Sequence, residues 1–166
     1  REYGKISGNE NHGLTPYDIF LIAEGKKDGD SEAAKKAFAM FGEVAGDAIA
    51  TAVTLTDSLV VIGGGITGAA KYIMPALLDE MRSSLHTLGG DEVQRVQLRV
   101  FDLDNELEFA KFALGDSREL KVYGSEETVI YDPMKRTGVA ITRVGASKAI
   151  MIGAYAYALA QIDSNM

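Results

Sequence analysis

A glycine-rich stretch, Gly63-Gly64-Gly65-Ile66-Thr67-Gly68, has the composition of a nucleotide-binding turn. It follows the apolar residues 59–62, which we predict to be a strand, and precedes a predicted helix from about residue 69. Glycine has no Cβ, so a ligand can lie directly against the backbone at such a loop. Ligands bind beyond the carboxyl ends of strands in open α/β sheets, and the next helix offers free N–H groups to them.

The loop by itself is compatible with three interpretations: a tight strand-to-helix turn without a ligand, a mononucleotide site and a dinucleotide site. Gly63, Gly65 and Gly68 fit the spacing G-x-G-x-x-G of dinucleotide-binding proteins. That fingerprint also requires an acidic residue about 20 positions further on, at the end of the next strand. Asp91 and Glu92 precede the next predicted strand and Asp102 comes too late, which disfavours the dinucleotide site.

Composition excludes several other kinds of chemistry. The 166 residues carry a net charge of −7, which argues against nucleic-acid binding by this segment. There is no cysteine, and His12 and His86 are not spaced as metal ligands, so we expect no metal site. No uninterrupted run of about 18 apolar residues occurs, so we expect no membrane span. The N-terminus has no signal-peptide pattern.

Two helices are predicted before the glycine-rich loop. The first begins at Thr15-Pro16, where Thr15 is a good N-cap, Pro16 suits the first helical position and Gly25 ends the helix. The second is predicted over residues 31–55, where apolar residues recur with the 3.6-residue period of a helix buried along one side. Residues 1–14 are expected to be irregular.

The rest of the chain alternates strands and helices. Residues 59–62 are apolar at consecutive positions, which is typical of a parallel strand covered on both faces. We predict a helix over 69–85, a strand over 93–101, a short helix beginning at Asp104, a hairpin of 120–123 with 128–131, a strand over 139–142 and a last helix over 147–161. Inward-facing residues are expected at Leu107, Phe109, Phe112 and Ala113 in the short helix, and the last helix carries Ile150, Ala154, Tyr157 and Ala158 on one face.

In this order, several segments resemble the C-terminal region of the ROK family (repressor, open reading frame, kinase). The resemblance covers about residues 15–85 and 138–160. It rests on Thr15-Pro16 with Ile19 and Ala23, on Asp30 and Ala33-Ala34, on Phe41-Gly42, on Leu55-x-Asp57, on Val60-Val61-Ile62-Gly63-Gly64-Gly65-Ile66 and on the closing segment 145–156.

The resemblance implies the C-terminal lobe of an actin-like, ribonuclease-H-like ATPase fold, with a mixed sheet flanked by helices. It implies an ATP-dependent sugar kinase that transfers a phosphoryl group to a hexose such as glucose, with Mg²⁺ on the ATP phosphates. Carried over by residue, Gly63, Gly64, Gly65, Ile66 and Thr67 would border the adenosine. The N-terminal half of the same protein would complete the site, and a cytoplasmic homo-oligomer is expected.

The sequence also departs from the family. The Asp-x-Gly-x-Thr phosphate loop, the Glu-x-Gly-His sugar motif and the cysteine-rich zinc segment are absent, so no catalytic residue is assigned. We therefore expect residues 1–166 to form a single domain, the C-terminal part of a kinase, that is inactive alone. The alternative is the sugar-sensing half of a ROK transcriptional repressor. Residues 101–137 are predicted to be a family-variable insertion, in which Tyr123 and Tyr131 would be tested for an interface.

Overall fold

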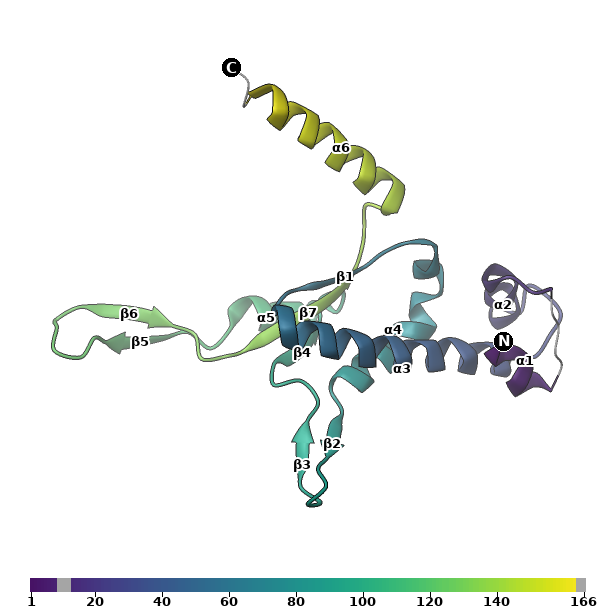
Figure 1. Cartoon of the computed structure of the whole chain (residues 1–166), viewed down its shortest axis with the longest axis horizontal. Coiled ribbons are helices and arrows are strands. Elements are labelled where there is room, and N and C mark those ends of the chain that lie inside the picture. The colour runs from purple at the N-terminus through teal and green to yellow at the C-terminus, as the bar shows by residue number, and fades with distance from the viewer. Residues whose placement is uncertain (9–12, 164–166) are drawn as a thin grey trace.

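A parallel three-stranded sheet lies at the centre of the chain, in a computed structural model that describes residues 1–8 and 13–163 (Figure 1). Strand β7 (Arg136–Ile141) lies in the middle, with β1 (Val60–Ile62) and β4 (Arg99–Asp102) on either side and parallel to it. Thr137, which is buried, donates its hydroxyl to the Ser58 carbonyl at 2.8 Å and fastens β7 to the start of β1. The predicted mixed sheet is, in the described residues, a parallel sheet accompanied by separate antiparallel hairpins.

Two helices form the core beside the sheet. Helix α3 (Ser31–Thr56) is capped by Asp30, whose carboxylate accepts the Ala33 N–H at 2.9 Å. It packs closely along α4 (Ala70–Met81), and the contact is made through glycines. A Cβ at Gly42 or Gly46 would lie 2.3 or 2.6 Å from a carbonyl oxygen of α4. The long buried helix predicted for 31–55 is therefore confirmed.

The N-terminal segment adds two short helices. Helix α2 (Pro16–Ala23) starts with the predicted cap, in which the Thr15 and Asp18 side chains bond reciprocally to each other's backbone N–H. Residues 1–14 were expected to be irregular, but α1 (Glu2–Ser7) forms within them. It is held by Tyr3, which is buried and whose hydroxyl accepts the Asp30 N–H at 3.1 Å. A contact across 27 positions of sequence leaves no local signal.

The strand predicted over 93–101 is divided into two. Its first part, β3 (Glu92–Gln94), pairs with β2 (Ser84–His86) in a projecting antiparallel hairpin, so the preceding helix ends at Met81 and not at residue 85. Its second part is β4 in the central sheet. Arg95 sits at the division and forms ion pairs with Asp47 of α3 and Glu80 of α4. Tertiary ion pairs thus interrupt a segment whose alternation alone predicts one strand.

The following helix, α5 (Glu106–Leu114), is capped by Asn105 rather than by Asp104, because Asn105 Oδ1 accepts the N–H groups of the first turn. Its predicted inward face is wrong for Leu107, Phe109 and Ala113, which are exposed. Phe112 is half-buried and packs edge-on against Phe101, with ring centroids 5.8 Å apart. The predicted hairpin is confirmed as β5 (Arg118–Lys121) and β6 (Thr128–Tyr131).

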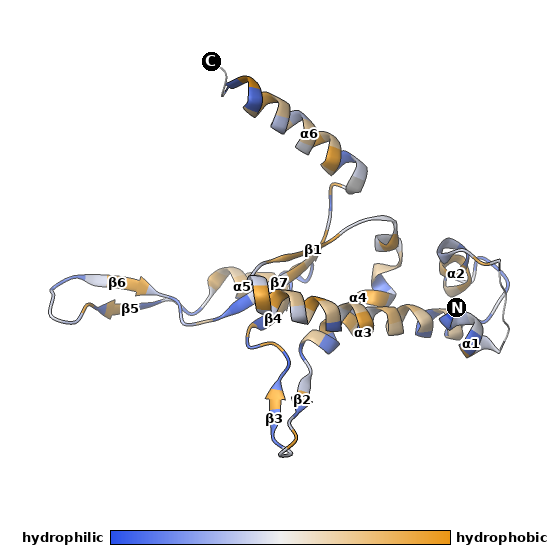
Figure 2. Cartoon of the chain, in the orientation of Figure 1, coloured by the Kyte–Doolittle hydropathy of each residue, from blue (hydrophilic) through white to orange (hydrophobic). Residues whose placement is uncertain are grey.

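One face of the sheet is uncovered. Val60 and Ile62 pack against the core, but Val61 on the opposite face is 67% exposed and Leu59 is 58% exposed. The prediction that this strand is covered on both faces is therefore wrong for the described chain. Helix α6 (Ala146–Asp163) leaves the end of β7 and stands away from the body, with apolar residues along its length (Figure 2). The residues predicted to share one face of it, Ile150, Ala154, Tyr157 and Ala158, are exposed.

Helix α3 is long and apolar enough to cross a membrane by length and composition, although the sequence has no unbroken apolar run of that length. Its most apolar 18-residue window has a mean hydropathy of 1.3, and 28% of that window is buried. The helix lies in the core, where Phe38, Gly42, Ala50 and Val53 are on its buried face. One such helix is weak evidence for a membrane span, because core helices of soluble proteins also pass a test of length and composition.

Candidate nucleotide-binding edge

The glycine-rich loop lies at the carboxyl edge of the central sheet. Because β1, β4 and β7 are parallel, the segments that follow them meet at one edge. Gly63 follows β1 and Thr142 follows β7, and the Thr142 N–H donates to the Ile62 carbonyl at 2.8 Å. This is the place that the sequence predicted for the loop.

The loop is closed by its own hydrogen bonds. Gly64 has φ 96° and ψ −176°, a conformation that residues with a side chain rarely adopt. Its carbonyl accepts both the N–H and the hydroxyl of Thr67, at 3.2 and 2.8 Å. A short 3₁₀ helix, η1 (Gly65–Ala69), then leads into α4. The backbone turns sharply without any bulky side chain on its outer side.

The outer side of the loop is bare. Gly63, Gly64 and Gly65 are exposed. A Cβ at Gly64 or Gly65 would meet no atom of the described chain within 4 Å, and one at Gly63 would meet only the Thr142 Cγ2 at 3.4 Å. Ile66 differs from the glycines because its side chain packs against the core, so it could offer a ligand only its main chain. The Thr67 hydroxyl is held by Gly64.

An ion-paired cluster fixes the helix that follows the loop. Lys71 Nζ lies 2.7 Å from Glu24 Oε1, and the Tyr72 hydroxyl donates to the same oxygen at 2.7 Å. The Lys71 ammonium, and then the Tyr72 hydroxyl, hold the pKa of Glu24 below its ordinary value, and Glu24 raises the pKa of Lys71. The start of α4 is thereby attached to the end of α2, which steadies the loop from behind.

Sequence reasoning missed the charged side chains at this edge. Asp104 follows β4, its Oδ2 accepts the Ile141 N–H at 2.7 Å, and its Oδ1 lies 3.8 Å from the Arg143 guanidinium. Asp102 accepts the Asp104 N–H at 3.0 Å. The signal was present, because Asp104 follows the predicted strand over 93–101 as the glycines follow the strand over 59–62. Its importance was missed because the sequence alone does not show that β1, β7 and β4 lie in one parallel sheet.

Two cavities open at the carboxyl edge. One, of about 520 Å³, lies between α4 and the ends of β4 and β7, and is lined by Lys71, Met74, Asp102 and Asp104 among others. The other, of about 590 Å³, lies on the uncovered face over Val61, Phe109 and Ala140. Among the described residues, neither lining includes residues 63–67. The loop is therefore open on its outer side, and any wall opposite it must come from outside the described chain.

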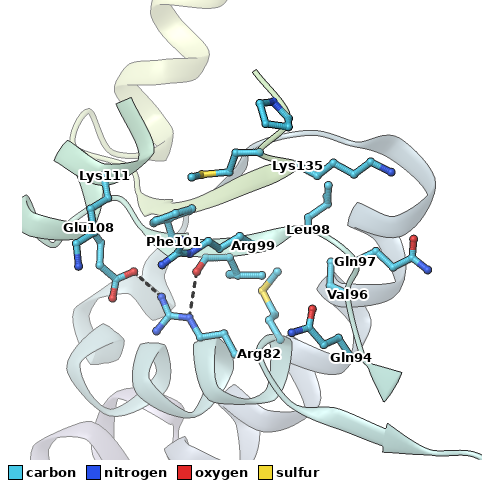
Figure 3. A pocket seen from close by; sticks show the side chains of 14 residues that line it. Arg82, Gln94, Val96, Gln97, Leu98, Arg99, Phe101, Glu108, Lys111 and Lys135 are labelled. Atoms are coloured by element: carbon cyan, nitrogen blue, oxygen red, sulfur yellow. Dashed lines mark hydrogen bonds and ion pairs between the residues drawn. The ribbon is translucent and has the colours of Figure 1, made fainter. Parts of the chain in front are cut away.

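A third cavity, of about 750 Å³, lies at the opposite, amino edge of the sheet (Figure 3). Its charged side chains make structural contacts. Arg82 Nε donates to the Val100 carbonyl at 3.2 Å, and Arg82 Nη2 donates to Glu108 Oε2 at 2.5 Å. The Arg99 guanidinium sits over the Phe101 ring, with 5.2 Å between its Cζ and the ring centroid. This cavity is remote from the glycine-rich loop and shares none of its residues.

Metal ligands do not gather in the described chain. Within residues 1–8 and 13–163, no group of three or more His, Asp or Glu side chains is placed to hold a metal ion. His86 lies in β2 on the projecting hairpin and is exposed. His12 lies outside the described residues.

Comparison with known proteins gives one informative similarity. The chain resembles the crystal structure of a glucokinase from Parabacteroides distasonis, with 48% sequence identity and a TM-score of 0.81. The similarity covers 96% of this chain and 42% of the glucokinase chain. No protein-family model matches, and no curated protein does.

The similarity extends over nearly all of this chain, at an identity far above the level where only a fold is shared. It is consistent with the predicted actin-like fold, and it supports a relationship to a sugar kinase rather than the alternative of a transcriptional repressor. The chain spans less than half of the glucokinase that it matches. The predicted resemblance to a glucokinase is thus confirmed, and the match is consistent with the C-terminal half of such an enzyme.

Proposed function

We propose that this chain is the adenosine-binding half of an ATP-dependent sugar kinase, which transfers a phosphoryl group from ATP to a hexose such as glucose. The observation that carries the proposal is the bare main chain of Gly63, Gly64 and Gly65 at the carboxyl edge of a parallel sheet. The similarity to a glucokinase supports it. Alternative interpretations of the loop, an empty turn or a dinucleotide site, have no such support.

In this proposal the chain supplies position rather than proton transfer. The main chain at Gly64 and Gly65 would lie against the base and ribose, and Ile66 would contribute only backbone atoms. When bound, Mg²⁺ would neutralise charge on the transferring phosphates. Phosphoryl transfer depends on groups placed on both sides of the nucleotide. The sequence has no Asp-x-Gly-x-Thr loop, so we propose that the chain alone is inactive.

The other half of the site would come from the rest of the kinase. Its N-terminal half would hold the hexose and the phosphate loop, and together they would enclose ATP. The intact protein would work in the cytoplasm, where its ATP is supplied.

Calorimetric titrations of the purified chain with ATP, and separately with adenosine, test the nucleotide site. Gly65→Val places a branched side chain where no atom of the described chain lies within 4 Å, so it should fold normally while it occupies the proposed ligand space. We expect affinity to fall at least about tenfold, which corresponds to about 1.4 kcal/mol. Gly13→Val, at another open glycine away from the loop, is the matched control and should bind as the native chain does.

Equal affinity of Gly65→Val and the native chain would refute the loop as the site. Tighter binding of NAD than of ATP would instead support the dinucleotide site. A coupled assay with glucose and ATP tests the inactivity of the chain separately, and glucose-dependent ATP turnover by the purified chain would contradict that part of the proposal.

A further inference from the structure

The β5–β6 hairpin is exposed on both of its faces. It projects from the body between α5 and β7, and every residue of both strands is exposed (Figure 1). The cross-strand pairs Leu120–Val129 and Arg118–Tyr131 place Leu120, Val129 and Tyr131 on one face, which leaves apolar side chains in water. A two-stranded hairpin is marginally stable in water unless further strands or a helix cover it. The hairpin therefore needs a partner.

The two free edges of this hairpin differ in charge. Strand β5 carries Arg118, Glu119 and Lys121, and charged side chains on an edge strand oppose pairing with another chain. Strand β6 reads Thr-Val-Ile-Tyr, with no charge and no proline. Its central Ile130 is 83% exposed. The edge of β6 lacks the usual protection, and β6 is thus the strand that is suited to accept another strand.

The hydrogen-bond pattern identifies the free groups on that edge. The Val122 N–H donates to the Glu127 carbonyl at 2.9 Å, which marks these two residues as a hydrogen-bonded pair in the antiparallel register. Such pairs alternate along a hairpin. Val129 and Tyr131 therefore bond inward to β5, whereas the N–H and C=O groups of Thr128 and Ile130 point outward from the free edge.

A second copy of the chain fits these groups. A twofold axis at Val129 would place Thr128 opposite Ile130 of the partner subunit, so that the outward N–H and C=O groups on both strands pair reciprocally. The flanking Glu127 would lie opposite the uncharged Tyr131 of the partner subunit, so no two like charges would face each other across the interface. We propose that the chain dimerises by antiparallel pairing of β6 with β6 of a second copy, which joins the two hairpins into a four-stranded sheet.

The position of the hairpin also favours a second copy over the rest of the kinase. Strand β6 leads into the amino end of β7, whereas the glycine-rich loop and the start of α6 follow the carboxyl ends of β1 and β7. A polypeptide that covers a nucleotide on the glycine-rich loop would sit at the opposite edge of the sheet from the hairpin. This one step rests on the proposed function, whereas the free edge of β6 and its register do not.

Cysteine crosslinking tests the proposed register, because the chain has no native cysteine. At the axis, the Val129 positions would form a non-hydrogen-bonded pair with Cα atoms about 4.5 Å apart, which is within the range of a disulfide. Val129→Cys should form a covalent dimer under mild oxidation. Leu120→Cys, on the other strand but with similar exposure, is the control and should stay monomeric on a denaturing gel.

Light scattering of two further variants tests the interface without a disulfide. Ile130→Lys places a charge on each free edge and should convert the dimer to a monomer, whereas Ile130→Val should leave the dimer intact. A native chain that is monomeric at high concentration would overturn the proposal. So would a dimer that persists in Ile130→Lys, or one in which Leu120→Cys crosslinks as well as Val129→Cys, because association would then use another surface such as α6.

Discussion

At the residue scale, Thr15, Asp18 in the first turn of α2 and Lys27 beyond its end form a compact charged cap. Asp18 accepts hydrogen bonds from the Thr15 N–H at 2.8 Å and hydroxyl at 2.7 Å, and Lys27 lies 2.7 Å from its other oxygen. Lys27, followed by Thr15, holds the pKa of Asp18 well below its usual range. The ionised carboxylate is therefore favoured in the folded chain more than in the unfolded chain.

This cap makes the free energy of unfolding depend on pH in the acidic range. A group whose pKa is lowered by folding stabilises the fold above its unfolded pKa, which is about 3.9 for Asp, and this contribution is lost as the pH falls toward the lower folded pKa. We expect the native chain to be more stable than Asp18→Asn at pH 7 and the difference to shrink below about pH 4. Urea unfolding of both at pH 7 and at successively lower pH measures it.

Asp28→Asn, which removes an exposed carboxylate from the loop after α2, is the control for the change in net charge. It should shift the unfolding midpoint much less at pH 7. If Asp18→Asn and Asp28→Asn behaved alike across the pH range, net charge rather than the cap would explain the effect.

The residue scale is also where the sequence was most informative about the candidate site. Consecutive glycines after an apolar strand predicted a bare loop, and the main chain of Gly63, Gly64 and Gly65 is bare. The side-chain direction of Ile66 was not predictable, because it depends on how η1 packs on the core. Asp104 and Arg143 were missed because their importance follows from strand ends that only pairing defines.

At the element scale, the contact between α3 and α4 depends on two glycines. A Cβ at Gly42 would lie 2.3 Å from the Ile73 carbonyl oxygen, and backbone atoms cannot move aside as a flexible side chain can. Replacing an interior helical glycine by alanine ordinarily stabilises a helix by up to about 1 kcal/mol. Here the crowding should win, and Gly42→Ala should lower the free energy of unfolding by about 1–3 kcal/mol.

Gly153→Ala is the matched control for Gly42→Ala, because Gly153 is also inside a helix and an added Cβ meets no atom of the described chain within 4 Å. We expect it to leave stability unchanged or to raise it. Chemical denaturation followed by circular dichroism compares the two variants with the native chain. A Gly42→Ala chain as stable as the native one would mean that the two helices do not approach so closely.

Elements that rest on local signals were predictable, and those that rest on distant contacts were not. The Thr15 cap with Pro16 marked the start of α2, and a 3.6-residue period marked α3. The division of residues 93–101 follows from Arg95, whose ion pairs with α3 and α4 come from positions far away in sequence. The inward face predicted for α5 failed since no covering element lies over Leu107 or Phe109 in the described chain.

At the scale of the whole molecule, exposed apolar side chains lie on the uncovered face of the sheet and on α6. Leu59 and Val61 on the sheet and Ile150, Ile152 and Tyr155 on α6 are all exposed. A helix with apolar residues on every side is normally enclosed by other elements. The matched glucokinase is more than twice as long as the matched region, so the rest of such a protein would be available to enclose them. The consecutive apolar residues of β1 predicted burial on both faces, whereas the described chain covers only the face of Val60 and Ile62.

Hydrogen exchange distinguishes the buried helices of this chain from its exposed elements by the rates at which their amides exchange. Amides of buried, well-packed helices exchange only on large openings, whereas those of exposed elements exchange through local opening. We expect amides near Ala50 in α3 and Leu77 in α4 to be the most protected and those of α6 to exchange early. Mass spectrometry of peptides, at several protein concentrations, measures the exchange of the α3 and α4 amides and of the α6 amides. Strong protection of α6 at the lowest concentration would show that α6 packs within its own chain, and the open face would then need no other covering.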